Sequence, residues 1–245
     1  MRKILIYGAT SAMAVEFAKC FAKERASFFL VSRSEEKAQA VADDLRVRGA
    51  AQAEARSLDF GDFAAHEAVW KSALTTLGHI DVVLVAHGEM GDQTEGQNDY
   101  QHAEEVLKTN FLSVVSLVTP IANHFEKEGK GTIAVIASVA GDRGRQSNYI
   151  YGTAKGAVTT FLQGLRNRLH PSGVQVITIK PGFVATPMTA HLDQGPLFAS
   201  PEKVGTGIYD AVKSGKNEVY LPGYWRLIMS VIKGIPEPIF KRLKL

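Results

Sequence analysis

Cysteine is nearly absent from this sequence of 245 residues, and long apolar runs are missing. The one cysteine, Cys20, cannot form an internal disulfide, and its neighbours Phe17, Ala18 and Phe21 favour a buried structural thiol over a nucleophile. A single cysteine also suits a reducing compartment. No apolar run approaches the ~20 residues that a membrane span requires, and Gly8 comes too early for a signal peptide. We therefore expect a cytoplasmic protein.

A large excess of charge of either sign is missing as well. The sequence has 28 Lys and Arg against 25 Asp and Glu, for a net charge of +3. This mild excess suits an anionic cofactor but does not indicate a nucleic-acid partner. With 45% hydrophobic and 22% charged residues, no low-complexity linker and no internal repeat, the chain reads as one soluble α/β domain. We predict no metal site.

The sequence does contain a regular alternation of short apolar runs and longer amphipathic segments. The runs ILIY, FFLV, DVVLVA, TIAVIA and VQVITI are apolar on both faces, which is typical of parallel strands covered by helices on both sides. Within residues 1–221 we predict a Rossmann-like, doubly wound parallel sheet of about seven strands with helices on both faces. The predicted strands are 3–7, 28–32, 51–58, 80–86, 131–137, 174–180 and 218–221, and the predicted helices are 12–24, 34–48, 62–76, 99–126, 149–169 and 201–214.

The turn after the first strand has only one glycine, Gly8, with alanine at positions 9, 12 and 14. Small residues in such a turn let the backbone amides and the next helix N-terminus approach a pyrophosphate. A tight turn without a ligand would look much the same, so the signal depends on its place at the first turn of an alternating sheet. The expected cofactor contacts in this turn are Gly8, Thr10, Ser11, Ala12 and Met13.

Arg33 follows the second strand, at a place where an acidic residue would accept hydrogen bonds from the ribose hydroxyls of NAD(H). A guanidinium there can pair with a 2′-phosphate instead, so the sequence favours NADP(H) over NAD(H). The alternative is a solvated arginine at the start of a surface helix.

Further cofactor contacts are expected after the third and fourth strands. Asp59 could hold an adenine amino group or cap the helical region near Asp62, and the sequence leaves both open. His87 is expected to line the cofactor rather than to act as an acid or base, because stronger candidates lie elsewhere. The expected contacts here are Asp59, Phe60, Ala86, His87 and Gly88.

The strongest pattern joins a tyrosine, a lysine and a serine. Tyr151 and Lys155 are four residues apart in a predicted helix, so they lie on one face, one turn apart. A nearby ammonium is expected to lower the tyrosine pKa, which would let the hydroxyl exchange protons near neutral pH. Ser138 follows the fifth strand, where it could donate a hydrogen bond to a substrate oxygen. Tyrosine–lysine spacing alone is common, but this combination is specific.

Taken together, these motifs resemble the short-chain dehydrogenase/reductase family in its single-domain form. The resemblance covers the chain to about residue 220 and rests on Tyr151, Lys155, Ser138, Asn110 and the segment 181–186 (PGFVAT). It implies an oxidoreductase in which Tyr151 is the acid/base, Lys155 lowers its pKa and binds the nicotinamide ribose, Ser138 orients the substrate and Asn110 holds a water near the lysine. The residues expected to frame the nicotinamide are Pro181, Gly182, Val184 and Thr186.

Two segments depart from the family pattern. The first turn is usually rich in glycine in this family, but here Gly8 is its one glycine. The Asn-Asn-Ala-Gly segment that usually follows the fourth strand is replaced by residues 85–88 (VAHG). The first departure puts the cofactor contacts in doubt, and the second some structural hydrogen bonds of the site.

The segments expected to contact the substrate allow more than one interpretation. Residues 187–198 include Met188, Leu192, Leu197 and Phe198, which fit a partly apolar substrate or packing on the sheet. Polar side chains between Ser138 and Tyr151 could bind the hydroxyls or phosphate of a sugar substrate, or they could be solvated. These groups are Asp142, Arg143, Arg145 and Gln146.

The tail, residues 222–245, interleaves aromatic, aliphatic and basic residues. It fits either an interfacial helix on anionic lipid or a helix packed on the core or on another subunit. The sequence is also loosely similar to reductases of polyprenyl-phosphate-linked keto-sugars. We expect a small-molecule carbonyl or alcohol substrate and a homodimer or homotetramer. The alternative functions are a non-catalytic NADP(H)-binding regulator and a membrane-surface protein.

Overall fold

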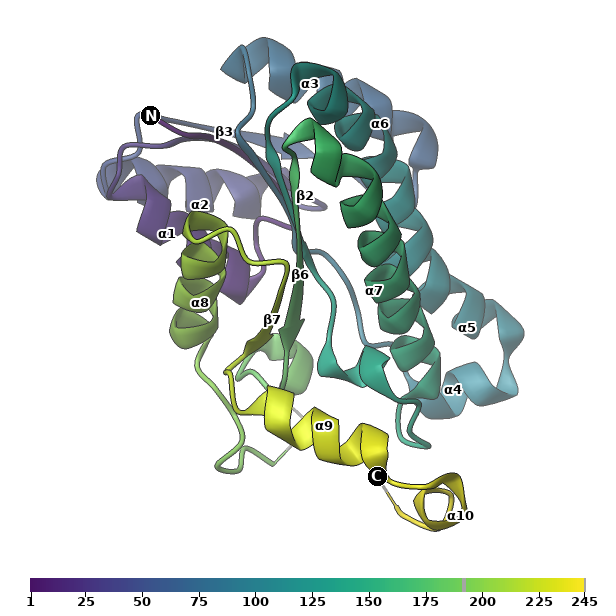
Figure 1. The fold of residues 1–245 in the computed structure, drawn as a ribbon. Helices are drawn as coiled ribbons and strands as arrows, with labels where there is room; N and C mark the ends of the chain where they lie inside the picture. Colours follow the sequence, from purple (N-terminus) through teal and green to yellow (C-terminus); the bar gives the residue numbers. More distant parts are fainter. Residues whose placement is uncertain (191–192, 245) are drawn as a thin grey trace.

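A computed structural model describes residues 1–190 and 193–244 and contains the predicted sheet (Figure 1). Its seven strands follow the order β3-β2-β1-β4-β5-β6-β7, and every neighbouring pair runs parallel. The carboxyl ends of all strands therefore meet at one edge, with the reversal of strand order between β1 and β4. The strands are β1 (Lys3–Tyr7), β2 (Ser27–Ser32), β3 (Gln52–Ser57), β4 (Val82–Val85), β5 (Thr132–Ile136), β6 (Gln175–Pro181) and β7 (Glu218–Leu221).

Helices cover both faces of this sheet, as predicted (Figure 1). One face packs on α1 (Ala12–Ala22), α2 (Glu35–Val47) and α8 (Pro201–Lys213). The other face packs on α3 (His66–Leu77), α6 (Ser113–Glu128) and α7 (Tyr149–Leu169). Successive side chains of a strand point to opposite faces, and both faces are covered. This explains why β2, which reads SFFLVS, is buried throughout.

Two helix starts follow from their capping residues. The Ser34 hydroxyl accepts a hydrogen bond from the Lys37 amide at 3.3 Å and caps α2. The Ser200 hydroxyl accepts one from the Lys203 amide at 3.3 Å, with Pro201 at the first position of α8. Both arrangements satisfy an amide that has no partner inside the helix. Each capping serine thus marks the start of its helix.

The single helix predicted over 99–126 is wrong in detail. A separate α4 (Gln93–Asn98) comes first, and Asp99 then caps α5 (Tyr100–Leu107). A π-helical turn (Lys108–Leu112) joins α5 to α6. Within that turn the Asn110 amide donates to the Val106 carbonyl at 2.9 Å, so a side chain occupies an acceptor of the helical ladder.

The segment Tyr100–Glu128 meets the length and composition of a membrane span, with 29 residues and a hydropathy of 1.2 in its most apolar window. Its inner face is nevertheless part of the core, because Val114, Leu117 and Val118 are buried against the sheet. In the fold it serves as a core helix.

The tail forms α9 (Trp225–Gly234) and the short α10 (Glu237–Phe240). Helix α9 lies at the carboxyl edge of the sheet, near the start of α7 (Figure 1). Its inner face buries Trp225 and Met229 beside Val139. Of the alternatives left open for the tail, packing on the chain's own core is therefore observed for this face.

Candidate active site

A cavity of about 490 Å³ opens at the carboxyl edge of the sheet. Its walls come from the residues that follow strands β1 to β6 and from the first turns of α7. All but one of the predicted site residues line it: Gly8, Thr10, Ser11, Ala12, Met13, Arg33, Asp59, Phe60, Ala86, His87, Gly88, Ser138, Tyr151, Lys155, Pro181, Gly182, Val184 and Thr186. Asn110 is the exception, because it is fully buried behind the wall.

The first turn needs its one glycine. Gly8 has φ +79°, and a Cβ on it would lie 2.4 Å from the His87 backbone nitrogen. Ala9 and Ala14 are buried in the core, while Ala12 lines the cavity. Alanine is therefore accommodated at the positions where the family usually has glycine, and the turn remains tight where the backbone requires it.

The N-terminus of α1 faces the same cavity with free amides. The Ser11 side chain forms no capping hydrogen bond. The amides of Ala12 and Met13 also have no backbone acceptor among the described residues. Unpaired amides and the helix dipole favour an anion at this place, so the turn fits a pyrophosphate.

Two basic residues line the cavity where the chain leaves β2. Arg33 is exposed and lines the cavity, and Lys37 from the first turn of α2 lines it as well. Lys37 was not predicted from the sequence, although its place four residues after Arg33 on the same edge could have indicated it. Together they form a cationic end that suits a phosphate on the adenosine ribose.

The segments after β3 and β4 are held together by stacking. The rings of Phe60 and His87 lie 4.1 Å apart and nearly parallel, and His87 Nε2 lies 2.7 Å from the Ser113 hydroxyl. Burial lowers the pKa of His87 to about 3, so the ring is neutral and structural. Asp59 lines the cavity but accepts a hydrogen bond from the Gly61 amide at 2.9 Å, which stabilises its own turn rather than a helix start.

The predicted tyrosine, lysine and serine meet inside the cavity. Lys155 is 3% exposed, and its ammonium donates to the Ile136 carbonyl at 3.1 Å. The same ammonium lies 5.7 Å from the centre of the Tyr151 ring, one helical turn away. The Ser138 hydroxyl accepts a hydrogen bond from the Ala140 amide at 3.1 Å and lies beside the Tyr151 hydroxyl. The three side chains thus line one part of the cavity.

The pKa of the tyrosine differs from the sequence expectation. Burial raises the pKa of Tyr151 to about 12, and the Ser138 hydrogen bond only partly opposes this rise. Burial also lowers the pKa of Lys155 to about 8, because the ammonium is desolvated without a carboxylate partner. The predicted lowering by Lys155 is thus not found in the chain without cofactor, and Tyr151 holds its proton at neutral pH.

The Asn110 side chain fixes the backbone of Glu89, which lines the cavity. Its amide nitrogen donates to the Glu89 carbonyl at 2.8 Å, and its oxygen accepts from the Glu89 amide at 3.2 Å. A Cβ on Gly88 would lie 2.7 Å from the Asn110 oxygen and 3.2 Å from the Lys155 ammonium. Gly88 therefore lets the lysine and the asparagine approach each other, while the water-holding role of Asn110 stays a prediction.

Comparisons with known proteins agree with this geometry. The model of the short chain dehydrogenase family matches residues 2–196. The chain belongs to the short-chain dehydrogenase/reductase family. An uncharacterized oxidoreductase of Mycobacterium tuberculosis is 32% identical over 240 residues, which cover 98% of this chain and 96% of that protein. A ketoacyl reductase of Nostoc sp. is 26% identical over 223 residues, 89% of this chain and 77% of that protein.

A solved structure shows the same fold. Actinorhodin polyketide ketoreductase with NADPH, in a variant form, superposes with a TM-score of 0.81 over 91% of this chain and 96% of that one, at 22% identity. The Rossmann-like, seven-stranded prediction is thus confirmed for this short-chain dehydrogenase/reductase.

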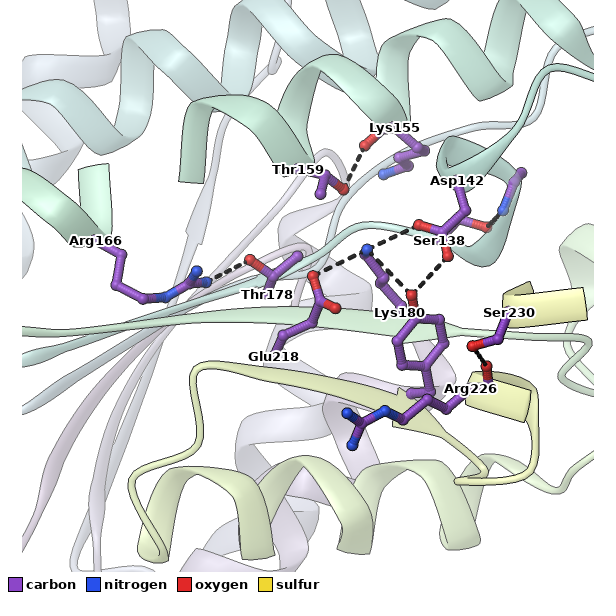
Figure 2. Close-up of polar contacts among 12 residues, drawn as sticks. Ser138, Asp142, Lys155, Thr159, Arg166, Thr178, Lys180, Glu218, Arg226 and Ser230 are labelled. Atoms are coloured by element: carbon purple, nitrogen blue, oxygen red, sulfur yellow. Dashed lines mark hydrogen bonds and ion pairs between the residues drawn. The ribbon is translucent and has the colours of Figure 1, made fainter. Parts of the chain in front are cut away.

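A buried ion cluster fixes the loop that carries the serine (Figure 2). The Lys180 ammonium lies 2.8 Å from an Asp142 oxygen and 2.9 Å from a Glu218 oxygen. The Tyr220 hydroxyl donates to the other Asp142 oxygen at 2.7 Å. Burial by itself would lower the pKa of Lys180, but the hydrogen bonds that its ammonium donates to Asp142 and Glu218 raise this pKa above its usual range. Asp142 is therefore engaged in structure, and the sequence suggestion that it reads substrate hydroxyls is wrong.

Arg143 attaches the tail to the same loop. Its guanidinium donates to the carbonyls of Ile232 at 2.7 Å and Ile235 at 2.6 Å, where α9 ends. It also pairs with Glu237 at 3.0 Å and lies 3.6 Å from the centre of the Phe240 ring. A cation at carbonyls left free by a helix end is favourable. Arg143 is thus a structural clamp and does not contact the cavity.

The tail packs behind one wall of the site. A Cβ on Gly182 would lie 1.9 Å from Trp225 Nε1, so the glycine is needed for the indole to pack there. Phe183 lines the cavity, packs edge-on against Trp225 and stacks on Phe198. Met188 lines the cavity as well, whereas the predicted Leu192 lies outside the described residues. Sequence reasoning missed Trp225, because its partner Gly182 is distant in the chain.

Proposed function

We propose that this protein reduces a ketone or aldehyde to an alcohol with NADPH, with Tyr151 as the proton donor. The observation that carries the proposal is the half-buried Tyr151 in the cavity wall with Ser138, one turn from the buried Lys155. A phenol with its pKa raised to about 12 carries a proton at neutral pH, and the reduction of a carbonyl consumes such a proton.

The residues divide the work. The bound nicotinamide supplies a hydride to the carbonyl carbon. Ser138 donates a hydrogen bond to the carbonyl oxygen, and Tyr151 gives the proton that turns this oxygen into a hydroxyl. Lys155, buried behind the tyrosine, binds the nicotinamide ribose and restores the tyrosine proton. The amides at the start of α1 bind the pyrophosphate, and Arg33 binds the 2′-phosphate.

Consumption of NADPH against a panel of ketones, aldehydes and β-keto esters tests the proposal. The β-keto esters are included because one relative is named a ketoacyl reductase. At least one carbonyl class is expected to be reduced with release of the matching alcohol. NADPH binding without reduction of any class would favour the non-catalytic regulator instead.

The cofactor preference rests on Arg33 and Lys37. Replacing Arg33 with alanine is expected to raise the KM for NADPH by about 10–100-fold and to leave the KM for NADH unchanged, because one charge-assisted pair with the 2′-phosphate is lost. Arg48→Ala is the matched control, since Arg48 lies at the end of α2 and pairs with Asp44. An unchanged KM for NADPH in Arg33→Ala would contradict the assignment.

The outward face of the tail supports membrane contact. Leu227 is 72% exposed and Val231 62% exposed, and they lie among the exposed cations Arg226 and Lys233. We expect the protein to float with vesicles that contain anionic lipid and not with neutral ones. Leu227→Ser with Val231→Ser should abolish flotation, whereas Val47→Ser, at a remote exposed site, should not. Failure of the wild-type chain to float would refute membrane contact.

A further inference from the structure

The loop between Ser138 and Tyr151 carries three charged side chains, and two of them have structural partners. Asp142 is bound to Lys180 and Tyr220, and Arg143 clamps the end of α9. The third, Arg145, takes part in no ion pair among the residues that the structure describes. Its Nε is buried and has no hydrogen-bond partner there. Among the described residues, Arg145 is therefore the charged side chain of this loop without an ion-pair partner.

Arg145 lies in the wall of the active-site cavity. Asn148, three residues later, lines the same wall, and its side-chain oxygen is also buried without a partner. The lining of the same cavity includes the apolar Val139, Phe183 and Met188. Burial lowers the pKa of Arg145, which reflects desolvation without a compensating carboxylate. Buried polar groups normally have partners, so this pair of orphaned groups points to a ligand.

The position of Arg145 assigns it to the substrate rather than to the cofactor phosphates. The amides of α1 follow β1 and Arg33 follows β2, whereas Arg145 follows β5 together with Ser138. In the strand order β2 and β5 are three spacings apart, which is about 14 Å at the ~4.8 Å between neighbouring strands. Arg145 thus comes from the same connection as the groups that handle the carbonyl.

We propose that Arg145 binds an anionic oxygen group, a carboxylate or a phosphate, on the carbonyl substrate. The inference rests on the proposed carbonyl reduction and specifies the substrate class. A guanidinium offers two parallel donors to such a group, and the unpartnered Asn148 side-chain oxygen can accept a hydrogen bond from an adjacent hydroxyl. The half-buried position of Arg145 strengthens this pairing, because charges that are partly removed from water are screened less.

Two matched pairs of substrates test this. The first is 4-oxopentanoate and its methyl ester, and the second is dihydroxyacetone phosphate and dihydroxyacetone. In at least one pair the wild-type enzyme should prefer the anion, and Arg145→Gln should lower kcat/KM for that anion by about 10–100-fold and remove the preference over its neutral partner. Arg145→Lys should restore part of the loss. Arg226→Gln, which removes an exposed arginine from α9, should change neither value.

A binding measurement separates this inference from the proposed reaction. The melting temperature of the NADP⁺-saturated chain is measured with 4-oxopentanoate and with inorganic phosphate. At least one of them should stabilise the wild-type chain and not Arg145→Gln, even if none of the four carbonyls is reduced. Equal stabilisation of both chains, or none in the wild type, would overturn the proposal. So would a tenfold rise in the dissociation constant of NADPH in Arg145→Gln, since Arg145 would then belong to the cofactor site.

Discussion

Tyr151→Phe is expected to lower kcat for carbonyl reduction by about 10²–10⁴-fold and to leave the dissociation constant of NADPH within twofold. The substitution removes one oxygen and keeps the ring, so the packing beside Lys155 remains. The lost hydroxyl is the proposed proton donor, and burial keeps it protonated at neutral pH by raising its pKa. Steady-state rates of NADPH oxidation and the fluorescence of bound NADPH measure the two quantities.

Tyr149 supplies the matched control for this change. It lies two residues earlier in α7, is 42% exposed and does not line the cavity. Tyr149→Phe should therefore leave both quantities at wild-type values. Undiminished turnover of Tyr151→Phe would refute the assigned role, and an equal loss in both variants would point to damage of the helix rather than to a missing proton donor.

Lys155→Met is expected to lower kcat by roughly 10²–10³-fold and at the same time to stabilise the chain without cofactor. A buried ammonium whose pKa falls from 10.5 to about 8 costs the folded state ~3 kcal/mol at neutral pH. The lost hydrogen bond to the Ile136 carbonyl offsets about 1 kcal/mol of this gain. The net gain of about 2 kcal/mol corresponds to a rise of roughly 4–8 °C in the melting temperature.

The pH dependence of this stabilisation follows from the direction of the shift. Below pH 8 the lysine is protonated in the folded and the unfolded chain, so the wild type carries the full penalty. Between pH 8 and 10.5 Lys155 loses its proton in the folded chain but keeps it in the unfolded chain. The cost of the buried ammonium therefore decreases, and the difference in stability between Lys155→Met and the wild type becomes smaller. Melting temperatures of both chains from pH 6 to 10 measure the difference. A variant that is less stable than the wild type at pH 7 would contradict the expectation.

The sheet was predictable from the sequence because its signal is local. Strands such as β2 and β4 are apolar on both faces, and a parallel sheet covered on both sides requires this pattern. The caps Ser34 and Ser200 are local signals as well. The Tyr151–Lys155 pair was predictable because both residues occupy one face of one helix.

Other features depend on partners that are distant in the sequence. The π-helical turn at Asn110 arises where the amide pairs with Glu89, 21 residues away. Arg143 finds the end of α9 across 89 residues, and Tyr220 meets Asp142 across 78. Periodicity also could not tell a tail face packed on the core from one facing lipid. The pKa of Tyr151 was misjudged because burial, which raises it, is a property of the folded site.

One isotope experiment tests the central claim most directly. NADPH that carries deuterium at both hydrogens of nicotinamide C4 is incubated with the protein and the carbonyl panel, and the alcohols are analysed by mass spectrometry. The proposed reaction predicts one deuterium at the carbinol carbon of at least one product, formed by the wild type and strongly reduced in Tyr151→Phe. NADPH that binds but delivers no deuterium to any product would contradict it.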